Sequence, residues 1–213
     1  MQYVENKGNE KIVRKIVSQI HENASYLSEI DGATGDGDHG INMNKGFMMA
    51  NDRIQDTDSF SEALKTLGKT LVNDIGGSMG PIYGTLFLKL SRTFKKGEII
   101  TAEIFEEALK NVKEGLMDLA GAKPGDKTLV DTVVPAYEQF KEANEEGVSF
   151  KECLERLEEG AEAGKESTKG MVAKLGRASR LGERSKGHLD AGATSCCIIL
   201  KAMADGMIEA LQE

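Results

Sequence analysis

Residues 31–44 read Asp-Gly-Ala-Thr-Gly-Asp-Gly-Asp-His-Gly-Ile-Asn-Met-Asn, and no other stretch of the chain places three carboxylates, a histidine and four glycines so close together. The glycines let the backbone turn tightly enough to bring Asp31, Asp36 and Asp38 to one point. Because converging carboxylates repel one another, the sequence predicts a cation between them. Hard oxygen ligands that leave room for a phosphate are typical of a Mg²⁺ site.

Two other interpretations of this stretch were weighed. Aspartate and glycine are also the residues that ordinary surface turns prefer. A calcium-binding EF-hand loop is excluded, because a loop starting at Asp36 would place Phe47 where a bidentate glutamate is needed. Helical periodicity that begins at Met43, directly after the acidic residues, favours a metal site over a turn.

The spacing of apolar residues predicts eight helices and no convincing strand. We expect helices over about 9–28, from Gly40, from the Ser59 capping box to Gly76, from Pro81, over 101–121, over about 128–145, from the Ser149 capping box to about 175, and from 191 to the end. Their short connectors predict an all-α, antiparallel up-and-down bundle or barrel, with residues 1–213 as a single domain.

In an up-and-down bundle, alternate connectors lie at the same end. The connectors 29–38, 76–80, 121–127 and 176–190 therefore share one face, and they are the glycine-rich ones. Gly76 and Gly77 precede a helix opened by Pro81, an arrangement that can present backbone N–H groups to an anion. The sequence thus predicts that the unusual loops gather into one ligand-binding face.

Composition limits the function classes. A formal net charge of -8 argues against nucleic acid as a partner, because phosphate backbones bind basic surfaces. We find no signal-peptide core, and the most apolar window, near 196–200, is stopped by Lys201, so we expect a cytoplasmic protein that does not enter a membrane. Cys153, Cys196 and Cys197 have neither disulfide-framework nor metal-site spacing and are predicted to fill the core.

Four ordered motifs resemble the ADP-binding L subunits of bacterial dihydroxyacetone kinases and the equivalent C-terminal domain of single-chain, ATP-dependent kinases. The motifs are Gly-Asp-Gly-Asp-His-Gly-Ile-Asn-Met at 35–43, Gly-Gly-Ser-Met-Gly-Pro-Ile-Tyr-Gly at 76–84, Ala-Lys-Pro-Gly-Asp at 122–126, and Gly-Arg-Ala-Ser through Leu-Gly-Glu-Arg-Ser to Gly-Ala-Thr over 176–194. This resemblance implies an eight-helix antiparallel barrel with a nucleotide and Mg²⁺ at one end.

The resemblance also implies residue roles. Asp31, Asp36 and Asp38 match the ligands of two Mg²⁺ ions. The positions that match nucleotide contacts are His39, Asn42, Ser78, Met79, Gly121, Leu129, Arg177, Asp190, Ala191 and Gly192. Members of the family commonly have proline where this chain has Ala191, an aromatic residue where it has Arg180, and methionine where it has Leu129.

The implied activity is that of a phosphotransferase that works only with partner subunits and uses no protein nucleophile. In the phosphoenolpyruvate-dependent members, ADP is a cofactor that a phosphotransferase-system subunit rephosphorylates in place, and the γ-phosphate of the resulting ATP passes to dihydroxyacetone on a separate subunit. Two alternatives remain open: an ATP-exchanging subunit of a kinase for another triose or tetrose, and a non-catalytic regulatory adaptor.

Overall fold

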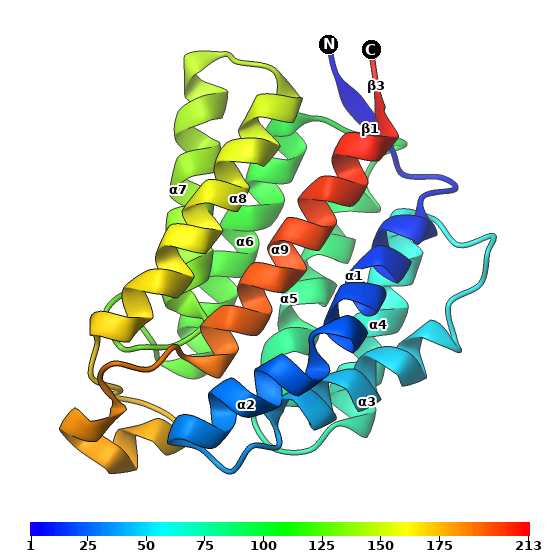
Figure 1. The fold of residues 1–213 in the computed structure, drawn as a ribbon. Coiled ribbons are helices and arrows are strands. Elements are labelled where there is room, and N and C mark those ends of the chain that lie inside the picture. The colour runs from blue at the N-terminus through cyan, green and yellow to red at the C-terminus, as the bar shows by residue number, and fades with distance from the viewer.

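A closed ring of antiparallel helices forms the body of the protein, as the computed structural model of residues 1–213 shows (Figure 1). The α-helices are α1 (Glu10–Glu22), α2 (Ala24–Thr34), α3 (His39–Asn51), α4 (Phe60–Asp74), α5 (Met79–Phe94), α6 (Ala102–Ala120), α7 (Val130–Glu146), α8 (Phe150–Ser167) and α9 (Ala191–Ala210). Two 3-10 helices, η1 (Thr168–Gly170) and η2 (Arg177–Ser185), lie between α8 and α9. The predicted all-α antiparallel barrel is confirmed.

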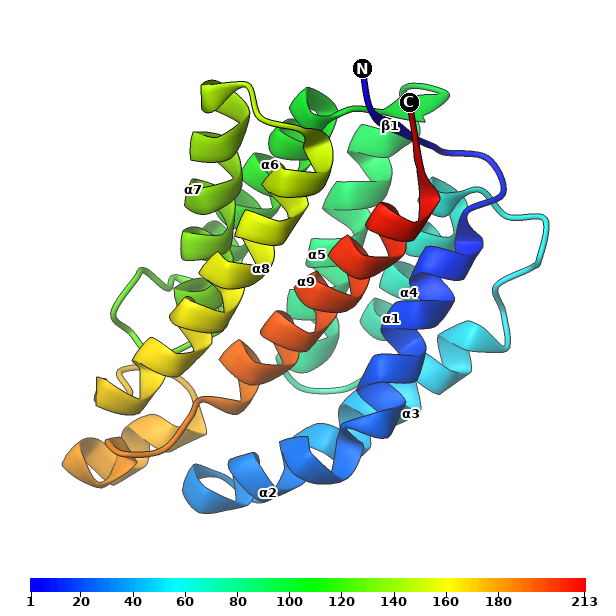
Figure 2. The same cartoon turned by 45° about the horizontal axis from the view of Figure 1, so that its top comes forward.

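The ring closes where the last helix meets the first. α9 packs against both α8 and α1, and Figure 2 shows it running between them. The three cysteines are buried, as predicted, and two of them lie on α9. By length and composition α9 could cross a membrane, but 72% of its most apolar window is buried inside the protein. Its apolar character is therefore explained by packing in the core.

A small sheet holds the chain termini at the end of the barrel opposite the glycine-rich connectors. Its strands are β1 (Tyr3–Glu5), β2 (Ile99–Ile100) and β3 (Leu211–Gln212), in the antiparallel order β2-β1-β3. Val4 pairs with both Ile100 and Leu211. The sequence analysis predicted no strand, because two or three residues are too few to display an alternating pattern.

Two predicted helices are shorter than expected. The helix predicted over 9–28 is divided at Asn23, whose side-chain amide donates to the Gln19 carbonyl (2.8 Å) and so caps the end of α1. Asp31 consequently lies in the last turn of α2 instead of in a loop. The helix predicted to reach residue 175 ends at Ser167, where the Thr168 hydroxyl donates to the Lys165 carbonyl (2.7 Å). Such local side-chain bonds compete with the helical ladder.

Close packing of α8 on α7 depends on small residues. Gly160 and Gly164 face the stretch of α7 around Pro135, and a Cβ atom at Gly160 would lie only 2.6 Å from the Pro135 carbonyl oxygen. Packed in this way, α8 runs antiparallel to α7 and ends at the end of the barrel where the glycine-rich connectors lie. The fold thereby positions the segment between α8 and α9 over that end.

Candidate functional site

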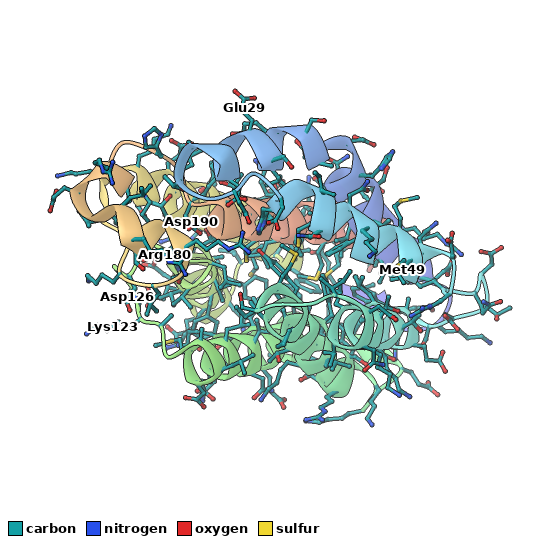
Figure 3. The ribbon with its side chains drawn as sticks, turned by 90° about the horizontal axis from the view of Figure 1, so that it is seen from below. Glu29, Met49, Lys123, Asp126, Arg180 and Asp190 are labelled. Carbon is teal, nitrogen blue, oxygen red and sulfur yellow. The ribbon has the colours of Figure 1, made fainter.

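A pocket of about 790 Å³ opens at the end of the barrel where the four glycine-rich connectors meet. Figure 3 views the molecule from this end, with Asp190, Arg180 and Asp126 labelled on the same side of the view. All the predicted site residues line the pocket except Gly121. Gly121 ends α6 in a left-handed conformation (φ 59°), so its place is in the turn beside the pocket.

The three acidic side chains converge on one point. Each of Asp31, Asp36 and Asp38 offers a carboxylate oxygen, and these oxygens lie within 4.8 Å of one another. The local sequence allows this convergence, because a Cβ atom at Gly35 would overlap the Asp31 carboxylate, and Gly37 adopts φ 75°. A cluster of three hard oxygen ligands at this spacing fits a divalent cation such as Mg²⁺.

Arg177 is the positive group nearest to these carboxylates. Its guanidinium contacts the Asp36 carboxylate and lies 3.7 Å from that of Asp38. Arg177 comes from η2, so two segments about 140 residues apart in the chain meet here. Three carboxylates that could hold a cation and one arginine that could contact an anion therefore lie together in the pocket lining.

Two helix N-termini point into the pocket, and helix N-termini favour anions. The N-terminus of α9 is capped by Asp190, whose carboxylate accepts from the Ala193 N–H (2.7 Å). Burial raises the pKa of Asp190 to about 6. The N-terminus of α5 follows Ser78, whose hydroxyl makes no capping bond, and so this hydroxyl remains available to a ligand.

A buried hydrogen-bonded network holds His39 in the pocket wall. The His39 Nε2 atom lies 2.9 Å from the Ser195 hydroxyl, which in turn lies 2.5 Å from the Tyr83 hydroxyl. Tyr83 also donates to the Gly192 carbonyl (3.2 Å). Burial lowers the pKa of His39 to about 4, an effect that the Asp31 carboxylate partly opposes. The imidazole is therefore neutral at physiological pH, with one nitrogen protonated and the other an acceptor.

Apolar side chains form another part of the pocket lining. They include Ile82, Leu119, Leu129 and Leu175. Leu119 is 50% exposed, which is unusual for a leucine on a helix of the barrel, and the pocket explains this exposure. A pocket with an apolar part beside a phosphate-binding part suits a ligand with an aromatic base at one end and phosphates at the other.

Three residues of this region, Tyr83, Ser195 and Lys127, were not predicted as site residues from the sequence. Ser195 looks like an ordinary member of a buried helix face, and only its contact with His39 marks it. Tyr83 lies in the quoted motif at 76–84, but no role was predicted for it. Lys127 was read as a loop residue, yet it is 1% exposed and lines the pocket. One signal was available for Lys127, since it directly follows the quoted Ala-Lys-Pro-Gly-Asp motif.

The sequence of this chain matches a known protein family. The family model for the DAK2 domain matches residues 33–205, a range that includes most of the helices and all but one of the pocket residues described above. The chain belongs to the DAK2 domain family. Asp31 lies two residues before the matched range, while Asp36 and Asp38 lie inside it.

DAK2 relatives resemble the chain over most of its length. It is 37% identical over 184 residues to the PEP-dependent dihydroxyacetone kinase, ADP-binding subunit DhaL, of Escherichia coli (strain K12), covering 85% of this chain and 87% of the relative. It is 31% identical to the L-erythrulose kinase of Pectobacterium atrosepticum, but there the match covers 85% of this chain and 32% of the relative.

The DAK2 fold is also found in solved structures. The dihydroxyacetone kinase of C. freundii in its native form matches with a TM-score of 0.70 and 21% identity, over 92% of this chain and 34% of that one. The same kinase in complex with AMP-PNP and Mg²⁺ matches with a TM-score of 0.66. At this identity the likeness establishes the shared barrel.

Proposed function

We propose that this DAK2-domain protein binds Mg-ADP and Mg-ATP and serves as the nucleotide-binding, phosphoryl-transferring subunit of a dihydroxyacetone kinase. The observation that carries the proposal is the pocket, in which three carboxylates, two helix N-termini and an apolar wall converge. The names of the relatives that match nearly end to end supply the reaction.

Asp31, Asp36 and Asp38 would hold the magnesium, as two ions shared among the three carboxylates. Bound Mg²⁺ neutralises the charge of the phosphates during transfer. A related C. freundii kinase has been solved with AMP-PNP and Mg²⁺, which supports a metal-nucleotide ligand for this pocket. The protein's own residues contribute orientation: phosphoryl transfer requires alignment of donor and acceptor more than it requires a protein nucleophile.

The nucleotide contacts follow from the pocket lining. We assign the phosphates to Ser78, Arg177 and the N-termini of α5 and α9, where Met79, Ala191 and Gly192 lie. His39, Asn42 and Asp190 provide polar contacts around them, and Leu129 belongs to the apolar wall for the base. Gly121 is assigned an indirect role, in shaping the turn that precedes Leu129.

The partners would be a subunit that binds dihydroxyacetone and a phosphotransferase-system subunit that rephosphorylates ADP in place. The words PEP-dependent and PTS-dependent in the names of the relatives support both. We treat the 213 residues as one nucleotide-binding unit, since Val4 and Ala210 belong to the same core. A cytoplasmic location remains part of this proposal, and the burial of α9 is compatible with it.

A second candidate has one specific observation in its favour. Three relatives at 29–31% identity are erythrulose kinases, so a tetrose acceptor with ATP as the exchanging donor is compatible with the same pocket. The chain covers only 32% of the first of these but 87% of the E. coli subunit. This difference in coverage favours the dihydroxyacetone assignment.

The test is to purify the protein with Mg²⁺, desalt it, and measure both the ADP retained and the rate at which labelled nucleotide replaces it. Retained, slowly exchanging ADP is expected for a cofactor recharged in place. Rapid exchange, with turnover on ATP and erythrulose, would favour the second candidate. Absence of any nucleotide binding in millimolar Mg²⁺ would contradict both.

A variant pair sharpens this test. Asp36→Asn should weaken Mg²⁺-dependent ADP binding by tenfold or more. A factor of ten in affinity corresponds to about 1.4 kcal/mol, and the loss of one bond to a charged group typically costs more than that. Asp118→Asn is the matched control, because Asp118 is exposed on the last turn of α6 but does not line the pocket. Equal affinity of the two variants would contradict the assigned metal site.

A further inference from the structure

Lys127 combines two features that are rarely found in one residue. Its side chain is buried, with 1% of the residue exposed, and its backbone has φ 62°, the only positive value at a non-glycine residue in the chain. A non-glycine residue is strained in this conformation, and such strain is often found where function requires it. Lys127 follows the turn that joins α6 to α7.

Neighbouring carboxylates impose this conformation. Asp131 accepts from the N–H groups of Gly125 (2.6 Å) and Thr128 (2.8 Å), which lie on either side of Lys127. Asp126 accepts from the Lys123 N–H (2.9 Å) and so closes the preceding turn. The backbone is therefore fixed before and after Lys127, and its side chain is directed inward.

The buried ammonium group donates to three backbone carbonyls. They belong to Met171 (3.2 Å), Ser185 (2.6 Å) and His188 (2.7 Å). Because an ammonium group has three N–H donors, all of its hydrogen-bonding capacity is used. None of these partners is a carboxylate, so carbonyl oxygens bind the ammonium group directly, while the nearby Asp190 carboxylate favours its charge without a hydrogen bond.

These carbonyls come from the two ends of one segment, residues 171–188, which we call the cover segment. It carries Arg177, the group that contacts the Asp36 carboxylate, and Figure 3 labels Arg180 on it and Asp126 beside it. Glycines at positive φ interrupt the segment at Gly176 (68°), Gly182 (55°) and Gly187 (91°). A segment with several glycines needs fixed ends to keep one arrangement over the pocket.

Inside the cover segment only one side chain joins the two ends. The Ser185 hydroxyl accepts from the Ala173 N–H (2.9 Å), and the Ser185 carbonyl is also the nearest partner of Lys127. The Lys174 side chain, on the solvent side of the cover segment, donates to the Asp126 carboxylate (3.2 Å), but it is 58% exposed. Two backbone bonds also hold the segment, from the Lys174 N–H to the Asp126 carbonyl (3.1 Å) and from the Gly187 N–H to the Lys169 carbonyl (2.8 Å). Lys127 is the buried side chain that bonds both ends of the segment.

We propose that Lys127 is a positioning residue that holds both ends of the cover segment, and with them Arg177, in place over the pocket and thereby slows the release of bound nucleotide. This inference rests on the proposed nucleotide-binding function. Lys127 acts through the segment it holds. Its loss should affect nucleotide residence time more than the overall stability of the barrel.

The experiment compares Lys127→Met, Lys127→Arg and Lys174→Met with the unchanged protein. Stopped-flow displacement of a fluorescent ADP analogue in Mg²⁺ gives the release rate, and amide hydrogen exchange without nucleotide reports on residues 171–188. Lys127→Met should release the analogue about tenfold faster, as expected when hydrogen bonds to a charged group are lost. Exchange should rise in the cover segment but not in α1 or α4.

The other variants separate positioning from a general structural role. Lys127→Arg keeps the charge and several donors, so it should restore slow release to within about threefold of the unchanged protein. Lys174→Met, the matched control, should change the rate less than about twofold because the Lys174 side chain is largely exposed and the backbone bond from its N–H to Asp126 remains. In steady-state assays with partner subunits, the nucleotide KM should rise more than kcat falls.

Two results would overturn the inference: an unchanged release rate in Lys127→Met, or a faster rate accompanied by uniformly increased exchange across all helices. Should Lys127→Met fail to fold, Lys127→Gln serves for the same comparison. If the unchanged protein binds no Mg-ADP, the proposed function fails. The exchange of the nucleotide-free proteins still decides whether Lys127 holds the cover segment.

Discussion

His39 is held in the pocket by Ser195 and Tyr83, two residues that belong to different helices. The bonds run from the imidazole to the Ser195 hydroxyl (2.9 Å) and on to the Tyr83 hydroxyl (2.5 Å). Since burial keeps the ring neutral, its orientation depends on these bonds and not on a charge. A residue that we propose contacts the nucleotide thus depends on others that need not touch it.

Removing the Ser195 hydroxyl should weaken nucleotide binding without unfolding the protein. We expect Ser195→Ala to raise the Kd of Mg-ADP about fivefold, the effect of one net hydrogen bond, as measured by calorimetry. Ser91→Ala is the control, because its buried hydroxyl donates to the Ser61 carbonyl (2.7 Å) away from the pocket. Similar affinity losses in both variants would show that the effect is a general loss of stability.

A second prediction concerns pH and a carboxyl group outside the pocket. Glu158 lies on α8, and its buried Oε1 atom has no hydrogen-bond partner. Burial, and then the nearby Asp205, raises its pKa to about 7, against the opposing influence of Lys201 and Lys15. The folded state therefore binds a proton that the unfolded chain releases near pH 4.5. Stability should fall as pH rises from about 4.5 to 7, and the loss should be complete above that range.

Glu158→Gln should remove this pH-dependent loss. Because the group is partly exposed, we expect a gain of about 1 kcal/mol at pH 8, which raises Tm by about 2–4 °C, and no gain at pH 4.5. Thermal melts at several pH values measure it. Glu159→Gln, an exposed neighbour, is the control. An equal gain at both pH values would contradict the assignment.

The convergence of Asp31, Asp36 and Asp38 was predictable, because the glycine and aspartate pattern is local in the sequence, and the resemblance of the four motifs supplied most of the other pocket residues. Lys127 was not, since its partners lie 44 to 61 residues further along the chain. The same holds for Ser195, whose partner His39 is 156 residues away. Contacts of this kind depend on the ring closure that brings α9 beside α1.

The periodicity of apolar residues predicted which stretches form helices better than it predicted where each helix begins and ends. The capping box of Ser59 and Glu62 was predicted and is present with both bonds. Asn9 stands at the cap position of α1, where asparagine is favoured, but its side chain donates to the Glu5 carbonyl instead (2.6 Å). Asn23 and Thr168 end helices through bonds to their own preceding turns, and a polar residue at such a place gives no strong signal in the sequence.

The contact between α7 and α8 gives a prediction at this scale. A Cβ atom at Gly164 would overlap the Asp131 carbonyl and approach the Thr132 Cα atom to 2.9 Å. Gly164→Ala should therefore cost about 1–3 kcal/mol by overpacking, measured as a lower urea midpoint. Gly170→Ala is the control, since no atom lies near its side-chain position. Equal midpoints would mean that the two helices separate easily.

The pocket is a property of the whole barrel. Its lining comes from every connector at one end, so a bound nucleotide would contact segments near the beginning, middle and end of the chain. The opposite end is closed by β1, which pairs with strands from residues 99–100 and 211–212. A ligand at one end and the sheet at the other would together restrain the same ring of helices.

Nucleotide binding should therefore stabilise the whole protein, and only with metal. At a free concentration 100 times Kd, Mg-ADP adds about 2.7 kcal/mol, which corresponds to a rise in Tm of about 5–10 °C. Differential scanning fluorimetry with ADP and either Mg²⁺ or EDTA measures this shift.

The metal requirement has an electrostatic reason. Without a cation, the ADP phosphates meet the carboxylates of Asp31, Asp36 and Asp38, which repel them. In Asp36→Asn the shift should be much smaller, while Tm without ligand should change little, because the loss of the Arg177 ion pair offsets the relief of repulsion between the carboxylates. An equal shift in Mg²⁺ and in EDTA would mean that the nucleotide binds away from the acidic cluster.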